Sequence, residues 1–252
     1  MNLTNKEKAQ IYHNAVSNYD LATIESMVCE NYIQHNPLVP TGRAAFLALI
    51  PQLKKHNSKI QNIRIFQDDS HVIMHHLWKQ AIPFGADEKV AFHLIRFDRS
   101  GLIAEHWSVM TDLAKPNLSK RSLIDGPTEI TDLENTEKNK ALVVKLFTSL
   151  VQSEINAYKD IFRDFFQPDF YQHHPKMTDG INGFVASKYN RQHKVFGSGN
   201  FVLSISEGVH GDKPTAFYDL FRIENDLIAE HWSIYQEIPQ MNLANENTMF
   251  GF

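Results

Sequence analysis

The spacing of apolar residues changes its period along the chain, and this predicts the order of the elements. Between residues 5 and 19 the apolar positions recur at the spacing of one helix face: Ile11, Tyr12, Ala15 and Val16. A short second helix is predicted after Asp20, a good N-cap residue, and a third after Gly42, which Pro51 should kink or end. Strands are predicted next, at residues 63–67, 71–79, 89–97 and 102–111. This order indicates an α+β domain whose helices cover one face of a curved antiparallel sheet.

The chain contains this pattern twice. LIAEHWS occurs at residues 102–108 and again at residues 227–233. YIQHNP at residues 32–37 corresponds to FYQHHP at residues 170–175, and each is followed at equal spacing by a glycine and a phenylalanine: Gly42 and Phe46, Gly180 and Phe184. Because the offset between matching positions shrinks along the chain, we expect the second copy to be shorter in its third helix and in two loops.

The repeat predicts two domains, residues 1–114 and 136–252, joined by a mostly polar linker at residues 115–135. Capping-box patterns at residues 4–7 and 131–134 predict where the first helix of each copy begins. The second domain includes a C-terminal tail whose residues 237–252 are too apolar for a free end. We expect this tail to pack across the first copy or a partner subunit.

Composition excludes several classes of function. With 42% hydrophobic and 21% charged residues, the chain can bury a core. The net charge is −4 and no stretch is strongly basic, so no nucleic-acid partner is expected. No apolar run approaches the roughly 20 residues of a membrane span, and the N-terminus lacks the apolar core of a signal peptide. Because Cys29 is the only cysteine, an intrachain disulfide is impossible, and a cytoplasmic location is the simplest expectation.

The motifs YIQHNP and LIAEHW, together with the ending ENTMFG at residues 246–251, resemble the SnoaL-like (polyketide cyclase-like) branch of the nuclear transport factor 2-like superfamily. The resemblance covers both copies. It implies that each copy is a cone of about three helices over a bent sheet, with a ligand pocket inside the cone. It also implies an intrachain version of the family's usual dimer, with a homo-oligomer as a further option. Members include cyclases, isomerases and dehydratases as well as dimerisation modules, so the fold does not specify the function.

One family position departs from the pattern in both copies. The resemblance implies a catalytic aspartate directly after the tryptophan of EHW, where this chain has Ser108 and Ser233. A serine hydroxyl is not a base near neutral pH without an activating neighbour. The family's polar position one hairpin earlier corresponds to His93 and Asp219.

Strand alternation sorts the residues of the EHW segments between two faces. If the aspartate position lines the pocket, the residues on the same face also do: His106, Ser108, His231 and Ser233. Trp107 and Trp232 then lie on the outer faces, where we predict that the two sheets pack against each other. The alternative is that each tryptophan packs under its own domain's tail.

The turn between the last two strands of each copy sets which residues face each other. A two-residue turn at Arg99 and Ser100 places His93 opposite His106, and the same register places Asp219 opposite His231. A bulge at Gly101 would shift this register. His35 and His173 recur in the Q-H-x-P loops, where they either point into the cone or tie the loop to the backbone. The expected substrate-binding residues are Ser108, Ser233, Tyr32, Tyr171, Gln34 and Gln172.

No metal or cofactor is expected. His75 and His76 are adjacent in a strand, so they point to opposite faces and do not form one metal site. Convergence of four histidines on a metal is a weaker alternative: His35, His76, His93 and His106. No HExxH, Walker-type, GxGxxG or GxSxG motif is present.

Two hypotheses remain open for the function. The first is a cofactor-independent cyclase, isomerase or dehydratase that uses His-centred acid–base chemistry on an apolar, carbonyl-containing substrate. The second is a ligand-binding or dimerisation module whose active site has degenerated. Under the first hypothesis the second copy is favoured as the catalytic half, with His231 as base, Asp219 as its orienting partner and His173 across the cavity. The first copy would then bind or serve as a scaffold.

Overall fold

The computed structural model describes residues 3–183 and 187–252, and its contacts divide the chain into two compact units. Domain one comprises the residues up to Asp112 together with Pro239–Gly251. Domain two comprises Leu113–Ile238 and Phe252. Phe184, part of the repeat evidence, lies outside the described residues. Within the described residues, no helix is long and apolar enough to cross a membrane.

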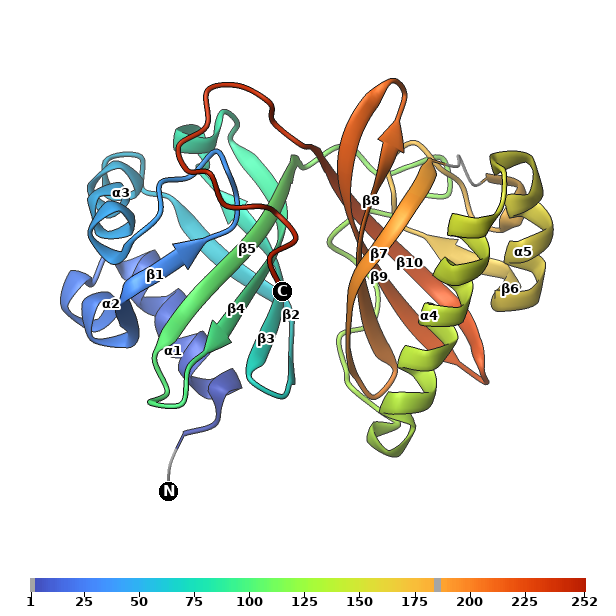
Figure 1. Ribbon diagram of the computed structural model, residues 1–252, viewed down its shortest axis with the longest axis horizontal. Helices are drawn as coiled ribbons and strands as arrows, with labels where there is room; N and C mark the ends of the chain where they lie inside the picture. Colours follow the sequence, from blue (N-terminus) through green and yellow to red (C-terminus); the bar gives the residue numbers. More distant parts are fainter. Residues whose placement is uncertain (1–2, 184–186) are drawn as a thin grey trace. The chain divides into compact units, whose positions relative to one another are not determined.

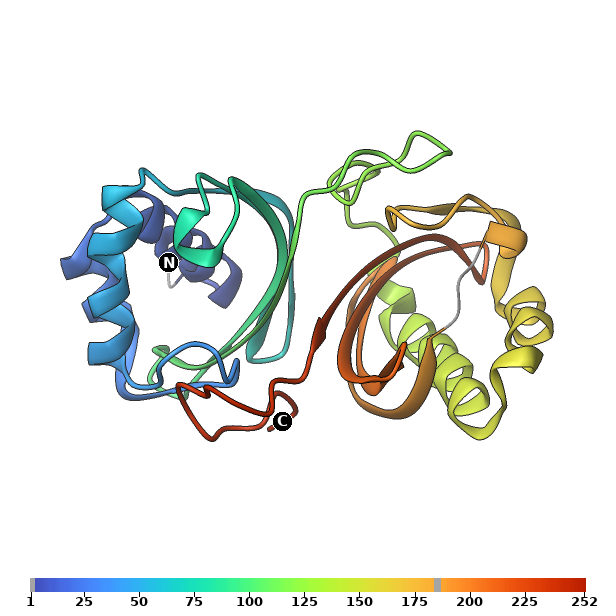
Figure 2. The same ribbon diagram turned by 90° about the horizontal axis from the view of Figure 1, so that it is seen from above.

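Domain one is a five-stranded sheet that bends around three α-helices (Figures 1 and 2). Its elements in chain order are α1 (Asn5–Asn18), α2 (Leu21–Met27), β1 (Val28–Gln34), α3 (Arg43–Lys55), β2 (Lys59–Asp68), β3 (His71–Lys79), β4 (Glu88–Phe97) and β5 (Ile103–Asp112). The strand order is β1-β5-β4-β3-β2. The fold class is therefore α+β, as the sequence pattern predicted.

Domain two has the same arrangement of strands as domain one but fewer helical residues. Its main elements are α4 (Thr136–Gln152), α5 (Tyr158–Phe165), β6 (Phe166–Gln172), β7 (Lys188–Ser198), β8 (Phe201–His210), β9 (Lys213–Glu224) and β10 (Leu227–Glu237). The strand order β6-β10-β9-β8-β7 matches that of domain one. Where domain one has α3, the described part of domain two has a single 3₁₀ turn at Ile181–Gly183.

Local sequence signals explain some helix ends and not others. Thr4 forms the predicted capping box with Glu7, and Asp20 caps α2 through the backbone N–H of Thr23. Pro51 does not end α3, which continues to Lys55. The second capping box, at residues 131–134, is wrong: α4 begins later, at Thr136, after an Asn135 cap that makes no side-chain hydrogen bond.

The first strand of each sheet was not predicted from the sequence. β1 pairs in parallel with β5, which places Gln34 beside His106. β6 pairs in parallel with β10 in the same way, which places Gln172 beside His231. A parallel partner far away in the chain leaves no turn signal in the sequence, so local patterns do not reveal it.

The predicted hairpin register is wrong by two residues. His93 pairs with Ser108 instead of His106, because the turn is one residue wider than expected and a bulge follows where Phe97 pairs with Ile103. The same two irregularities place Asp219 opposite Ser233 in domain two. Two one-residue shifts preserve the side-chain parity, so the residues predicted to share a face still share it.

Each domain is completed by an irregular segment that crosses β1 or β6. In domain one this is the C-terminal strap, Pro239–Gly251: the Asn245 side chain donates to the carbonyl of Asn36, and the Asn247 side chain to that of Gln34. In domain two it is the linker strap, residues 113–126, where the Asn117 side chain donates to the carbonyl of Gln172. The predicted linker and tail therefore serve as equivalent covers of the two domains.

Candidate functional site

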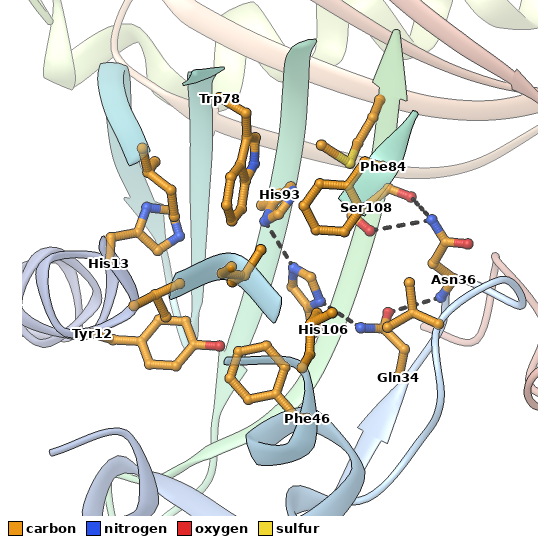
Figure 3. Close-up of a pocket in the computed structure, with 16 residues that line it drawn as sticks. Tyr12, His13, Gln34, Asn36, Phe46, Trp78, Phe84, His93, His106 and Ser108 are labelled. Carbon is orange, nitrogen blue, oxygen red and sulfur yellow. Dashed lines mark hydrogen bonds between the residues drawn. The ribbon is translucent and has the colours of Figure 1, made fainter. Parts of the chain in front are cut away.

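A cavity lies inside domain one, between the helices and the inner face of the sheet (Figure 3). Its empty volume is about 550 Å³, solvent at its opening included. Most of its lining is apolar or aromatic, and no Lys, Arg, Asp or Glu is among the described lining residues. Besides the aromatic residues Tyr12 and Trp78, the polar side chains that line it are His13, Gln34, Asn36, His93, His106 and Ser108.

Four elements and the loop after β1 position these side chains. His13 lies on the buried face of α1, at helical spacing with Ala9, Tyr12 and Val16. His93 comes from β4, and His106 and Ser108 come from alternate positions of β5. Gln34 ends β1, and Asn36 follows it. Regular elements thus hold most of the polar groups, with little freedom to move apart.

A chain of hydrogen bonds links the polar groups, and a backbone amide sets its direction (Figure 3). The Asn36 N–H donates to Oε1 of Gln34 over 2.9 Å, so the Gln34 amide nitrogen must donate to Nδ1 of His106, 2.8 Å away. Nδ1 of His106 therefore carries no proton, and its Nε2–H donates to Nδ1 of His93 over 3.1 Å. It follows that the remaining proton of neutral His93 is on Nε2, a buried atom with no hydrogen-bond partner among the described residues.

Burial keeps these imidazoles uncharged. Desolvation lowers the pKa of His106 to about 3 and that of His13 to about 4. Desolvation and the neighbouring histidines also hold the pKa of His93 and of His76 well below the ordinary value. At neutral pH the cavity therefore offers neutral rings that donate or accept hydrogen bonds.

Three of these histidines come close enough to suggest a metal site. His13, His76 and His93 place candidate ligand nitrogens within 4.8 Å of one another. The hydrogen bonds oppose metal binding. The Trp78 indole N–H donates to Nε2 of His76, so the proton of His76 is on Nδ1. The chain of hydrogen bonds likewise leaves the proton of His93 on Nε2. A metal ligand needs a lone pair at that nitrogen. The cluster therefore does not fit a cation.

Domain two has the same chain of hydrogen bonds with a different end. The His174 N–H fixes Gln172, Gln172 donates to Nδ1 of His231, and Nε2–H of His231 donates to Asp219 over 2.9 Å. Asp219 also accepts from the Tyr189 hydroxyl. Both nitrogens of His231 are thus engaged. The cavity beside it has an empty volume of about 200 Å³, and its other lining residues are apolar or aromatic.

His35 and His173, expected as pocket residues, lie on the opposite face of the sheet. The His35 ring stacks on Trp107 at 4.3 Å, and its Nε2 hydrogen-bonds Glu105 over 2.8 Å. Its Nδ1 donates to the carbonyl of Thr248 in the C-terminal strap. His173 repeats these contacts with Trp232 and Glu230. Both histidines tie loop, sheet and strap together, the second of the two roles that the sequence left open.

The predicted tryptophans and tyrosines also differ in where their side chains lie. Trp107 and Trp232 are buried, and the indole of Trp232 donates to the carbonyl of Asp125 in the linker strap. Packing of the two sheets against each other stays a prediction. Tyr32 is buried beside Gln34, whereas Tyr171, 44% exposed, stacks on Arg121 away from the cavity. The counterpart of Tyr32 in the repeat is Phe170, because Tyr171 falls one position later in its strand.

The sequence analysis missed several polar or aromatic cavity residues, among them His13, Asn36 and Trp78. His13 had a signal in the sequence, since it shares a helix face with Ala9, Tyr12 and Val16. The predicted face instead included Ile11, which is 40% exposed. Ser108 and His106 line the cavity as expected, and Ser233 is buried beside Asp219.

No protein-family model matches the chain, and the search of curated proteins returns no match. Solved structures similar to part of it include an NTF2-like protein of unknown function from Cytophaga hutchinsonii, at 13% identity and a TM-score of 0.37, covering 44% of this chain and 93% of that one. IdmH from Streptomyces antibioticus, named "a putative polyketide cyclase", is 18% identical, with a TM-score of 0.36 and coverage of 43% and 92%. A Kribbella flavida protein named "putative ketosteroid isomerase" is 14% identical, with a TM-score of 0.35 and coverage of 42% and 84%.

Proposed function

We propose that domain one binds a small, predominantly apolar molecule in its cavity and acts on it by cofactor-independent acid–base chemistry, while domain two serves as a scaffold. The observation that carries this proposal is the contrast in the two interiors. The domain-one cavity contains several neutral imidazoles in an apolar setting, whereas the smaller domain-two cavity is lined, apart from His231, by apolar and aromatic side chains. Concave, mostly apolar pockets with a few convergent polar groups are the usual sites for small ligands.

The acid–base part of the proposal depends on the protonation state of the domain-one histidines. A group that is to accept a proton must be unprotonated at the working pH, and burial achieves this for the domain-one histidines. The notable absence from the lining is a carboxylate, since Ser108 occupies the position where the resembling family has aspartate. Tyr12 also lines the cavity, but burial raises the pKa of its phenol far above neutral, so an imidazole is the group available to accept a proton.

A second candidate function is ligand binding without catalysis. The pKa of about 3 for His106 supports it, because a base this weak gains little from accepting a proton at neutral pH. The same cavity would then hold a ligand through apolar contacts and a few hydrogen bonds. The two candidates share the binding site and differ in turnover.

One probe separates the candidates. The probe is 2-tetralone, an uncharged bicyclic ketone with exchangeable protons beside its carbonyl, added in deuterated buffer at pH 7. NMR follows both the shifts of protein resonances and the loss of the ketone's α-protons. The proposal predicts shifts at cavity residues and α-proton exchange at least about tenfold above buffer, a typical general-base effect. Shifts without exchange indicate the binding module, and no shifts in domain one contradict both.

A matched pair of variants tests the location. Met110 lines the cavity, and the repeat places Tyr235 at its counterpart in domain two. Met110→Tyr should fill the cavity and reduce binding at least about tenfold through lost space. Met241→Tyr, the same change at a position that is 77% exposed, is the control and should bind normally. Equal binding by both variants would place the ligand elsewhere.

A further inference from the structure

Within the cluster of His13, His76, His93 and His106, one ring keeps a nitrogen that can accept a proton after the hydrogen bonds are assigned. His106 has both nitrogens engaged, and the unpartnered nitrogen of His93 carries a proton. The unpartnered Nδ1 of His76 also carries one, because Nε2 accepts from Trp78. These three rings offer no lone pair to a ligand.

His13 differs from its neighbours in this respect. Its Nδ1 lies 3.0 Å from Oδ1 of Asn62, an oxygen that only accepts, so the proton of neutral His13 is on Nδ1. Nε2 is then a lone-pair nitrogen. The ring lines the cavity beside His76 and His93, with ring centroids 4.9 and 6.2 Å away.

We infer that His13 is the proton acceptor of the domain-one cavity, and that Gln34 is a positioning residue that keeps His106 and His93 as donors. This inference rests on the proposed acid–base function and names the group that performs it. The ligand it fits is an uncharged carbonyl compound with an apolar body, since none of the described lining residues is a Lys or Arg that could balance a charged one.

The proton-transfer step is balanced without a cofactor. The C–H bond next to the ligand's carbonyl breaks, its proton forms an N–H bond at Nε2 of His13, and the electron pair moves onto the carbonyl oxygen. The resulting imidazolium keeps its Nδ1–H on Asn62. Return of the proton to the same or a neighbouring carbon restores neutral His13 and gives exchange or isomerisation.

The repeat supports a special role for this position. The buried face of α1, with Ala9, Tyr12, His13 and Val16, has the same spacing as Val143, Leu146, Phe147 and Leu150 in α4. Phe147 therefore occupies the place of His13, where it packs against Tyr189 and Phe221. The domain with the filled interior lacks the acceptor.

The surroundings of His13 determine its pH response. The titratable groups that face it are His76 on β3, His93 on β4, His106 on β5 and Tyr12 on its own helix. Burial lowers the pKa of His13 to about 4. We therefore expect an exchange rate that is constant between pH 6 and 8 and falls as the pH approaches 4.

The first test needs no ligand. Long-range ¹⁵N–¹H spectra of the full chain show which imidazole nitrogen carries each proton. We expect His13 protonated on Nδ1, and His106 and His93 on Nε2. In Gln34→Glu the carboxylate accepts from Nδ1 of His106, so the protons of His106 and His93 should both move to Nδ1. A proton on Nε2 of wild-type His13, or unchanged tautomers in the Gln34→Glu variant, would overturn the corresponding assignment.

The second test uses 2-tetralone. His13→Phe copies domain two, and His13→Gln keeps a polar group that can bond Asn62 if the phenylalanine variant does not fold. Both should bind the ketone within about threefold of wild type and lose at least tenfold in exchange rate. Undiminished exchange in a folded variant would overturn His13 as acceptor and leave the proposed function intact. Binding without exchange by the wild type would overturn both the acceptor and the acid–base function.

Discussion

The two domains share a strand order and a chain of hydrogen bonds, but the group that ends this chain and the packing around it differ. In domain two the chain of hydrogen bonds ends on Asp219, which also accepts from Tyr189. In domain one it ends on His93, whose last N–H is buried without a partner. A buried donor left unpaired costs about 1–3 kcal/mol, and at this end of the chain of hydrogen bonds domain one has such a donor where domain two has a paired carboxylate.

Side-chain packing in the core also differs between the two domains. The domain-two core contains a block of aromatic rings: Phe147, Phe162, Phe165, Phe166, Phe170, Phe217 and Phe221. Domain one has histidines and a cavity in the equivalent volume. Locally unfavourable groups that persist in one copy of a repeat are expected at functional sites, and this difference is why we assign function to domain one.

Acid should separate the domains most strongly. A histidine whose pKa is lowered in the folded state leaves stability unchanged above its unfolded value near 6.5, and stability falls as the pH drops toward the folded value. His13, at about 4, and His106, at about 3, together predict a loss of about 4 kcal/mol in domain one at pH 5. In domain two, His174 has a similarly lowered pKa of about 4.

Hydrogen exchange between pH 7 and 4.5 measures this difference. Amides of α1, β3 and β4 should lose protection before those of α4, β8 and β9. The lowered pKa values of Glu105 and its counterpart Glu230 affect both domains alike and do not alter the order. If protection is lost equally in both domains, the assignment of neutral histidines to domain one is wrong.

An aspartate at the two equivalent serines should also distinguish the domains. Ser233 pairs across the hairpin with Asp219, so Ser233→Asp places two carboxylates side by side in a buried site. We expect a loss of about 3 kcal/mol at pH 7. Ser108 pairs with His93 and lies near the Asn36 amide, so Ser108→Asp should cost about 1 kcal/mol. Urea unfolding compares the two, and equal losses would contradict the contrast.

Removal of the C-terminal strap gives a smaller, localised effect. Truncation after Ile238 exposes the site of Met249 and removes the amides that bond the carbonyls of Gln34 and Asn36. Burial of one methionine contributes about 2 kcal/mol, which corresponds to a shift in Tm on the order of 10 °C for a domain of this size. The shift should fall mainly on domain one, because Phe252 is the one removed residue that belongs to domain two, whereas Met241→Ala, at an exposed strap position, should leave Tm unchanged.

The sequence predicted the features that depend on local pattern. The repeat, the α+β class, the first helices and the parity of His106 and Ser108 all follow from spacing. The parallel strand β1, the bulge before Phe97 and the placement of His35 over Trp107 depend on partners far away in the chain. His13 was missed because one polar residue on an apolar helix face is usually a packing residue, and only the convergence of other histidines on it suggests chemistry.

The location of ligand binding tests the central claim most directly. Methyl and imidazole NMR spectra of the wild-type chain, recorded while 2-tetralone is added, report on both interiors in one sample. We predict shifts for Val16, Leu53 and His13 in domain one, and none for Leu146, Leu150 and His231 around the domain-two cavity. Shifts confined to the domain-two residues would contradict the account.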